Sequence, residues 1–193
     1  GLGNGETAIF PILIFKVKEG INLNEDDPNY DLFKLSCRVS AKRLFPNFSL
    51  LDAPFNLKYY KPNNPETEAT YMGCITRVMN NICGECEVSG RGNLSFTTIN
   101  LPRLGIEHGI IKNKKADLDG FFKDLDNKIN LVIDQLLERM EIQGNKPVKN
   151  FPFLMGQGIW RGSDRLNCND KLEDVIKEGT LTVGFIGLSE CLV

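Results

Sequence analysis

The sequence predicts an α/β fold, in which buried strands alternate with helices. Residues 7–17 (TAIFPILIFKV) are almost continuously apolar, as expected for a strand that is covered on both faces in a parallel sheet. Residues 118–140 repeat apolar side chains at helical spacing, with Lys, Asp and Glu between them, which is typical of a helix lying on a sheet. A second apolar run at residues 181–188 predicts another buried strand and completes the α/β pattern.

Periodicity and turn signals define the elements of the first half. Pro11 cannot donate a ladder hydrogen bond, so it marks a bulge or the start of the first strand. An acidic, proline-containing loop then leads to a predicted helix at residues 31–45. The apolar side chains expected on the inward face of this helix are Leu32, Leu35, Val39 and, at its end, Phe45. Residues 49–55 predict a short buried strand.

The second half begins with a predicted long strand. Residues 94–106 are rich in Phe, Thr and Ile, which favour strands, and Pro102 with Arg103 should end the ladder. The amphipathic helix at residues 118–140 follows, and a break containing Gly and Pro ends it. A short helix at residues 170–177 then precedes the last strand.

Composition and charge argue against several classes of function. The chain has 193 residues and a formal net charge of −2, from 23 basic and 25 acidic side chains, so nothing suggests the clustered basic face of a nucleic-acid-binding protein. No apolar run approaches the ~20 residues of a membrane span, and no signal peptide opens the chain. Six cysteines are too few for a secreted disulfide scaffold, so we expect a cytoplasmic protein.

Both ends of the sequence suggest a piece of a longer protein. The chain opens with GLGNG instead of Met and runs straight into an apolar strand. It stops with the residues CLV inside another apolar element. Because native termini usually lie in exposed polar segments, we expect an excised part of a larger chain.

The stretch around which the chain is organised, residues 71–107, contains a single cysteine on a short apolar run. Cys74 follows Gly73, and a glycine allows the backbone to pass close to something bulky. Apolar neighbours should bury the thiol, which raises its pKa and makes it a poor nucleophile. Two interpretations remain from the residues alone: an inert core cysteine, or a cysteine that works by losing a hydrogen atom.

A Cys-x-x-Cys pair, Cys83 and Cys86, offers a second possible site. One pair supplies only two of the four ligands of a structural zinc, and no other pair follows at finger spacing. It also does not open a helix after a strand, as a thioredoxin-type dithiol would. Inert hairpin cysteines are the first choice, and a partial metal or redox site is the alternative.

The only histidine, His108, follows Glu107 at the end of an element. Histidine is the usual acid–base residue near neutral pH. A sole histidine beside a glycine in a loop is more often a surface residue, so no role is assigned to it.

Four segments together resemble one protein family. They are FPNFSLLDAPFN, YMGCITRVMNN, GRGNLSFTTINLPRLGIE and GTLTVGFIGLSE, at residues 45–56, 71–81, 90–107 and 179–190. The family is that of the anaerobic (class III) ribonucleoside-triphosphate reductases, which are glycyl radical enzymes. The resemblance implies that residues 1–193 are a fragment of one ten-stranded α/β barrel domain, with the radical-cysteine loop around residues 71–93. It also implies that the N-terminal nucleotide-sensing and C-terminal glycyl-radical regions are absent.

The resemblance also implies roles for individual residues. Cys74 matches the cysteine that forms a thiyl radical and abstracts the 3′ hydrogen of a ribonucleoside triphosphate. Asn93 is a candidate to hydrogen-bond a substrate hydroxyl or formate, or it is simply a turn residue. Arg91 would meet an anion or form a structural salt bridge. Glu190 would lie near the substrate, or it is a charge placed by the helix dipole.

The implied cofactors and partners lie mostly outside this chain. They are a glycyl radical on a missing C-terminal segment, a radical-SAM activating enzyme that installs it, and formate as the reductant. Zinc is expected only in the missing C-terminal region, and the full-length protein is expected to be a homodimer. The Arg-x-x-Gly-Tyr signature of the glycyl radical does not occur in the sequence, so the isolated fragment should be inactive.

Two alternatives stay beside this interpretation. Another glycyl radical enzyme, of the formate-lyase kind, is disfavoured because such enzymes carry adjacent cysteines, whereas Gly73 and Ile75 flank Cys74. A non-catalytic thiol or metal-binding module would instead be built on Cys83 and Cys86.

Overall fold

The computed structural model of the chain describes residues 11–72, 76–112 and 115–192. These residues fold as two compact units, Gly1–Ser89 and Gly90–Val193, and each is described by itself. Both units mix helices with small parallel strand pairs, which confirms the α/β class. No helix among the described residues combines the length and the apolar character that crossing a membrane requires.

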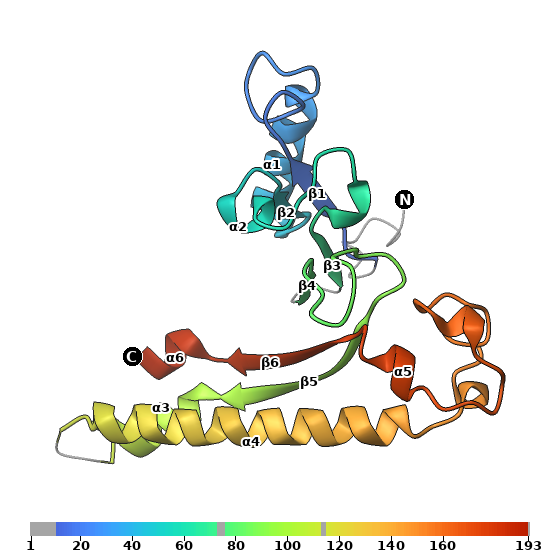
Figure 1. The fold of residues 1–193 in the computed structure, drawn as a ribbon. Helices are drawn as coiled ribbons and strands as arrows, with labels where there is room; N and C mark the ends of the chain where they lie inside the picture. Colours follow the sequence, from blue (N-terminus) through green and yellow to red (C-terminus); the bar gives the residue numbers. More distant parts are fainter. Residues whose placement is uncertain (1–10, 73–75, 113–114, 193) are drawn as a thin grey trace. The chain divides into compact units, whose positions relative to one another are not determined.

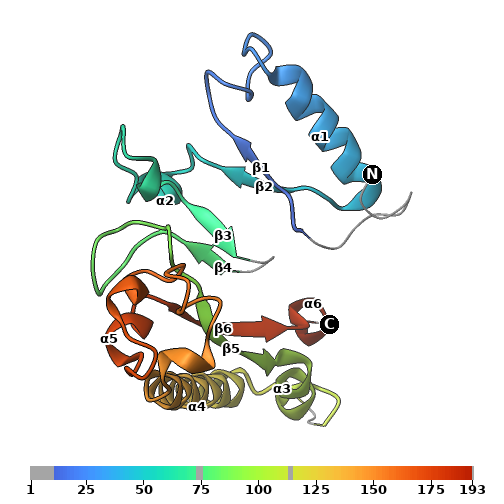
Figure 2. The same cartoon turned by 90° about the vertical axis from the view of Figure 1, so that its right-hand side faces the viewer.

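The first unit is built on a β–α–β motif. Strands β1 (Ile14–Val17) and β2 (Asn47–Leu50) pair in parallel, and helix α1 (Tyr30–Arg43) connects them and lies beside them (Figure 2). The remaining elements are α2 (Pro54–Leu57), the short 3-10 helix η1 (Pro65–Thr67), and the antiparallel strands β3 (Thr70–Met72) and β4 (Thr76–Val78). A parallel neighbour of the first strand is therefore present, and residues 7–10 of the predicted first strand lie outside the described residues. The strand predicted at residues 49–55 is wrong in its second half, because β2 ends at Leu50 and Pro54 begins the helix α2.

The inward face of α1 differs from the prediction. Leu32, Leu35 and Val39 are 48%, 52% and 40% exposed in this chain, so the prediction that they face inward was wrong. The face one residue further along packs instead, because the ring of Phe33 stacks 6.3 Å from that of Phe15 and meets Phe48 edge-on at 6.2 Å. A shift of one residue is a rotation of about 100°, and here the aromatic side chain determines which face turns inward.

The second unit is a parallel strand pair lying along one long helix. Strands β5 (Asn93–Asn100) and β6 (Thr180–Ile186) pair in parallel, and α4 (Leu118–Gly144) runs beneath both (Figure 1). The other elements are α3 (Leu101–His108), the 3-10 helices η2 (Val148–Asn150) and η3 (Ser163–Arg165), α5 (Glu173–Ile176) and α6 (Leu188–Leu192). The predictions of α4, of a short helix before β6, and of a strand at β6 are confirmed. The prediction that this last strand is buried was wrong for this chain, because β6 has no buried residue and Phe185 and Ile186 are each 62% exposed.

The predicted strand at residues 94–106 is only half a strand. The chain turns into helix α3 at Leu101, because the side chain of Asn100 caps the helix by accepting from the backbone N–H of Arg103 at 3.2 Å. Pro102 occupies the first turn, where its missing N–H costs nothing. The same proline that was expected to end the ladder therefore begins a helix.

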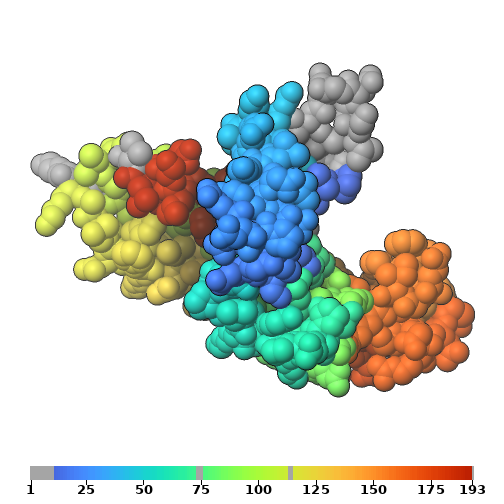
Figure 3. Space-filling view, turned by 90° about the horizontal axis from the view of Figure 1, so that it is seen from above, coloured from blue at the N-terminus to red at the C-terminus, as the bar shows by residue number. Residues whose placement is uncertain are grey.

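Two apolar clusters hold the second unit together. One joins α3 and α4 to the strand pair, and its buried members are Ile99, Leu101, Leu104, Val132 and Leu136. The other lies around the segment between α4 and β6, and its buried members are Val148, Met155, Trp160, Leu172, Val175 and Ile176. The space-filling view shows much of that segment, in orange, gathered into a compact group of atoms (Figure 3).

Candidate functional site

The GRGN segment, residues 90–93, is held in place by close backbone packing. Gly90 has a left-handed φ of +68°, and its carbonyl accepts from the backbone N–H of Arg161 at 2.6 Å. A Cβ atom on Gly92 would lie 2.7 Å from Cζ3 of Trp160. Glycine is therefore required at 90 by backbone conformation and at 92 by the indole ring.

The indole ring of Trp160 packs against this segment and is itself held in place. Its side chain is buried in the cluster around α5, and its indole Nε1 donates to the carbonyl of Val175 at 2.9 Å. A buried indole that is also hydrogen-bonded has little freedom to move aside. The position of residues 90–93 is thus fixed by the core of the second unit.

Arg91 connects the segment to the start of β6. Its Nε donates to the carbonyl of Glu178 at 2.7 Å, and the backbone N–H of Thr180 donates to the carbonyl of Gly92 at 2.9 Å. A charged donor on a backbone carbonyl makes a strong hydrogen bond. Of the two interpretations of Arg91, this contact supports a structural role, although its partner is a carbonyl and not a carboxylate.

Asn93 reaches the face of the strand pair that points away from α4. A β-bulge lies between Asn93, which pairs with Thr180, and Ser95, which pairs with Leu181. Ser95 faces α4, because its hydroxyl accepts from Nη1 of Arg139 at 3.1 Å. Since one inserted residue reverses the alternation of side chains, the bulge turns Asn93 to the opposite face.

A hydroxyl from β6 meets Asn93 on that face. The Oγ1 of Thr182 donates to the Oδ1 of Asn93 at 3.4 Å, and both residues are partly buried. This distance is long for an O–H···O bond, whose usual value is about 2.7–2.8 Å. The contact therefore orients the amide without holding it tightly.

Glu190 lies at the other end of the same strand pair. It belongs to α6, beyond the last residue of β6, whereas Arg91 and Asn93 lie at the start of β5. The seven residues of β6 span on the order of 20 Å. The structure thus brings two of the predicted site residues together and separates the third from them.

Glu190 lines a hollow of about 370 Å³ between α3, α6 and the start of α4. Most of its walls are apolar, and Phe121, Phe122 and Ile106 contribute to them. Glu190 and His108 are among its polar walls.

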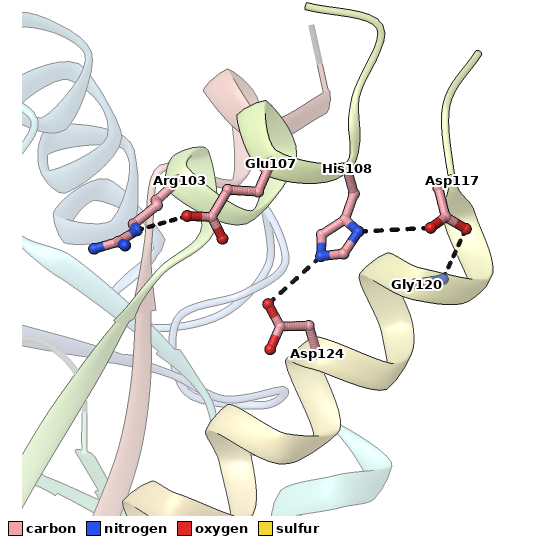
Figure 4. Close-up of polar contacts among 6 residues, drawn as sticks. All are labelled: Arg103, Glu107, His108, Asp117, Gly120 and Asp124. Atoms are coloured by element: carbon pink, nitrogen blue, oxygen red, sulfur yellow. Dashed lines mark hydrogen bonds and ion pairs between the residues drawn. The ribbon is translucent and has the colours of Figure 1, made fainter. Parts of the chain in front are cut away.

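His108 is more constrained than a surface residue. Its Nε2 lies 3.5 Å from Oδ2 of Asp124, its Nδ1 lies 3.9 Å from Oδ2 of Asp117, and its side chain is 22% exposed (Figure 4). The imidazole also meets the ring of Phe121 edge-on. The expectation of an ordinary surface histidine missed this arrangement, because the two aspartates come from the following helix and its cap.

A neighbouring ion pair lies on α3 itself. Arg103 Nε donates to Glu107 Oε1 at 2.9 Å, one helical turn along (Figure 4). This hydrogen bond lowers the pKa of the Glu107 carboxyl below its ordinary value. Because Arg103 is solvent-exposed and Glu107 is partly exposed, solvent screens the pair and it contributes little to stability.

Cys74 lies outside the described residues, with its neighbours Gly73 and Ile75. The strands on either side of it are described: β3 and β4 pair antiparallel, with Met72 opposite Thr76. In β3, Tyr71 accepts a hydrogen bond at its hydroxyl from the buried Ser49 of β2, at 3.2 Å. This bond joins the β3–β4 pair to the parallel strands of the first unit.

Cys83 and Cys86 show no metal-site geometry within the described part of the chain. Cys83 is exposed, and the thiol of Cys86 donates to Oδ1 of Asn80 at 3.1 Å. No group of three or more His, Cys, Asp or Glu side chains within the described ranges is arranged to hold a metal ion. A third ligand for this pair is therefore not provided by the described residues.

Comparison with known proteins gives a consistent result over the full length of the chain. A family model described as anaerobic ribonucleoside-triphosphate reductase matches residues 1–193. A relative from Escherichia coli (strain K12), named anaerobic ribonucleoside-triphosphate reductase, is 31% identical over 100% of this chain and 26% of its own length. Relatives of the same name from Salmonella typhimurium and Enterobacteria phage T4 are each 30% identical, over 26% and 31% of their own lengths. The chain thus spans between a quarter and a third of the length of these relatives.

Proposed function

The chain belongs to the anaerobic ribonucleoside-triphosphate reductase family, and we propose on this basis that it is the middle part of the enzyme's catalytic domain. The observation that carries the proposal is the family match over residues 1–193, which includes the motif YMGC with Cys74. The full-length protein would reduce ribonucleoside triphosphates to deoxyribonucleotides for DNA synthesis. It would act in the cytoplasm as a homodimer.

Both units would form parts of a single ten-stranded α/β barrel. Each contains a parallel strand pair with a helix on one face, which is the repeating element of such barrels. The open face of β5 and β6, opposite α4, would then look into the barrel. Asn93 and Thr182 lie on that face, which supports its assignment as the substrate-facing one.

Cys74 would carry the radical chemistry. When present, the glycyl radical, on a segment outside this chain, supplies an acceptor for the hydrogen atom of the Cys74 thiol. The Cys74 thiyl would take the 3′ hydrogen of the ribose, which weakens the neighbouring C2′–O bond so that the 2′ hydroxyl leaves as water. The same sulfur would return a hydrogen atom to C3′ at the end of the cycle. An apolar cavity suits these steps, because water and stray thiols would quench a thiyl.

Formate would supply the two electrons of the reduction. Overall, a ribonucleoside triphosphate, formate and one proton would give a deoxyribonucleoside triphosphate, carbon dioxide and water. A small carboxylate needs hydrogen-bond donors, and the amide of Asn93 is suited to that task. We propose Asn93 as a contact for formate or for a substrate hydroxyl, Arg91 as a nearby cationic group, and Glu190 as a more distant contact to the substrate.

The remaining partners would act on regions that this chain does not include. A radical-SAM activating enzyme would generate the glycyl radical near the C-terminus of the full-length protein. Zinc would also be bound in that C-terminal region.

The test is an activity measurement on the full-length protein, activated without oxygen. Cys74→Ser should form no deoxynucleotide, because a serine O–H bond is too strong to yield its hydrogen atom to the radical. It should still acquire the glycyl radical signal in electron paramagnetic resonance, which shows that folding and activation are intact. Cys168→Ser, at an exposed cysteine, is the matched control and should be fully active. A Cys74→Ser variant with wild-type turnover would refute the assignment.

A further inference from the structure

We infer that an apolar stripe on α1, made of Leu32, Leu35 and Val39, is the docking surface for a second helix of the full-length protein. That helix lies outside residues 1–193 and carries Asp or Glu beside its own apolar residues. The inference rests on the proposal that the chain is part of a longer barrel protein, and it does not depend on the radical chemistry.

The stripe is not the face with which α1 packs on its own strands. Phe33 contacts Phe15 and Phe48, and Ser36 is only 7% exposed, so these positions define the strand-facing side. The members of the stripe lie one residue before Phe33, Ser36 and Ser40, which is a rotation of about 100° around the helix axis. Each of them is at least 40% exposed in this chain.

The stripe has the spacing of a helix–helix contact. Leu32, Leu35 and Val39 are three and four residues apart, which places them in one row along the helix. Side chains of a second helix with the same spacing fit between them, whereas the two-residue repeat of a strand does not match the row. A contiguous exposed row of large apolar side chains marks an interaction surface in a soluble protein. A helix is therefore the partner that fits.

The direction of the stripe indicates where the second helix comes from. It points sideways from the strand-facing side, along the layer of helices that would cover the sheet. In an α/β barrel each helix has a neighbouring helix in that position. The chain covers only 26% and 31% of the lengths of two relatives, so most of such a layer would be formed by residues outside it. The occupant is therefore a helix of the same polypeptide and not a second copy.

Basic side chains continue the row at its C-terminal end. Lys42 and Arg43 follow Val39 by three and four residues, and Arg38 lies one turn before Lys42. All three basic residues are exposed. Opposite charges along the border of a helix pair favour the correct partner and register. The second helix should therefore carry carboxylates opposite this end of α1.

Thiol alkylation of the folded full-length protein tests whether the stripe is covered. Leu35→Cys places a thiol in the middle of the row, and Lys34→Cys, at an exposed position outside the row, is the matched control. Each alkylation rate is divided by the rate of the same variant in denaturant. The thiol of Leu35→Cys should then react at least about tenfold more slowly than that of Lys34→Cys, because it is reached only when the helices separate. Rates within twofold of each other would overturn the inference.

Carbodiimide cross-linking identifies the occupant, because the reagent joins an amine to a nearby carboxylate through an amide bond. We expect Lys42 to be linked to an Asp or Glu outside residues 1–193, in a segment with apolar residues at three- and four-residue spacing. The linked protein should keep the mass of a single chain in denaturing electrophoresis. Lys42→Arg keeps the charge and removes the amine, so it should lose this link. A link only in a product of doubled mass would identify a second copy and overturn the inference, as would a link within residues 1–193 or none at Lys42.

Failure of the inference is separable from failure of the proposed function, because both measurements use the protein before activation. If the stripe is accessible while the activated wild-type protein forms deoxynucleotide and Cys74→Ser does not, the inference falls and the proposed function stands. If the stripe is covered by a helix of the same chain but the activated protein forms no deoxynucleotide, the inference stands and the proposed reaction falls.

Discussion

Substitution of Gly92 by alanine tests whether the core of the second unit positions Arg91 and Asn93. The new Cβ would lie 2.7 Å from Cζ3 of Trp160, well inside the ordinary contact distance of about 3.4 Å or more. The indole cannot simply swing away, because it is 5% exposed and donates to the carbonyl of Val175. Either the ring or the strand must shift.

Overpacking of this kind costs about 1–3 kcal/mol. If the cost falls on the local opening of the β5–β6 pair, amide exchange there should accelerate by about five- to 150-fold. The hydrogen bond from the Thr180 N–H to the Gly92 carbonyl lies at the start of the strand pair. The acceleration of amide exchange should therefore be largest near Thr180. Hydrogen–deuterium exchange of the full-length protein, resolved by peptide, measures it directly.

A matched substitution distinguishes the steric clash at position 92 from the general effect of replacing a glycine by alanine. Gly144, at the end of α4, is also buried, but a Cβ there would lie 3.4 Å from its nearest neighbour, an ordinary contact. Gly144→Ala should therefore leave the exchange of β5 and β6 unchanged. If Gly92→Ala changed that exchange by less than twofold, the claim that Trp160 holds the segment would be refuted.

Three further predictions concern neighbouring contacts. Arg91→Met removes the donor to the Glu178 carbonyl, so amides at the start of β6 should exchange about tenfold faster, and unchanged protection would contradict the structural role. The hydrogen bond from Arg103 lowers the pKa of the Glu107 carboxyl in the folded protein. The pair therefore stabilises the fold fully at pH values above about 4.3, the pKa of an unfolded glutamate. This stabilisation is lost as the pH falls through the lower pKa of the folded protein. Arg103→Gln should raise the Glu107 pKa in a carboxyl NMR titration, and an unmoved pKa would refute the cause. Cys83→Ser should leave the zinc content of the full-length protein unchanged, and a stoichiometric loss would revive the metal-binding alternative.

The sequence predicts best the elements whose pattern of apolar residues extends over many residues. The stripe of apolar residues in α4 extends over many turns, so its helix and its packing against β5 and β6 follow from periodicity. Helix α1 is also predicted, but not its inward face. Two faces of this helix, shifted by one residue, could each turn toward the strands. The contact of Phe33 with Phe15 and Phe48 determines which of them does.

The boundary between β5 and α3 carries a local signal for the start of a helix. Residues 94–106 favour a strand by composition, yet Asn100 followed by Pro102 is a helix start signal. The hydrogen bond from the Arg103 N–H to the Asn100 side chain, together with Pro102 in the first turn, outweighs the weaker strand preference of the residues that follow.

The candidate site is only partly predictable because it depends on the register of two distant strands. Asn93 and Arg91 are identified by their motif, but the bulge that turns Asn93 away from α4 leaves no mark in the sequence. Thr182 becomes its neighbour only when β6 pairs with β5, 89 residues apart along the chain. The contacts of His108 are likewise not predictable from its own segment, because its aspartate partners come from the following helix and its cap.

Transfer of the 3′ hydrogen is the most direct test of the account. The activated full-length protein would be given a ribonucleoside triphosphate deuterated at C3′, and the rate of deoxynucleotide formation would be compared with that of the unlabelled substrate. We predict a primary isotope effect on kcat/KM in the wild-type protein and no product in Cys74→Ser, with the glycyl radical present in both. Deoxynucleotide formed by the serine variant would contradict the assignment of the thiyl radical to Cys74.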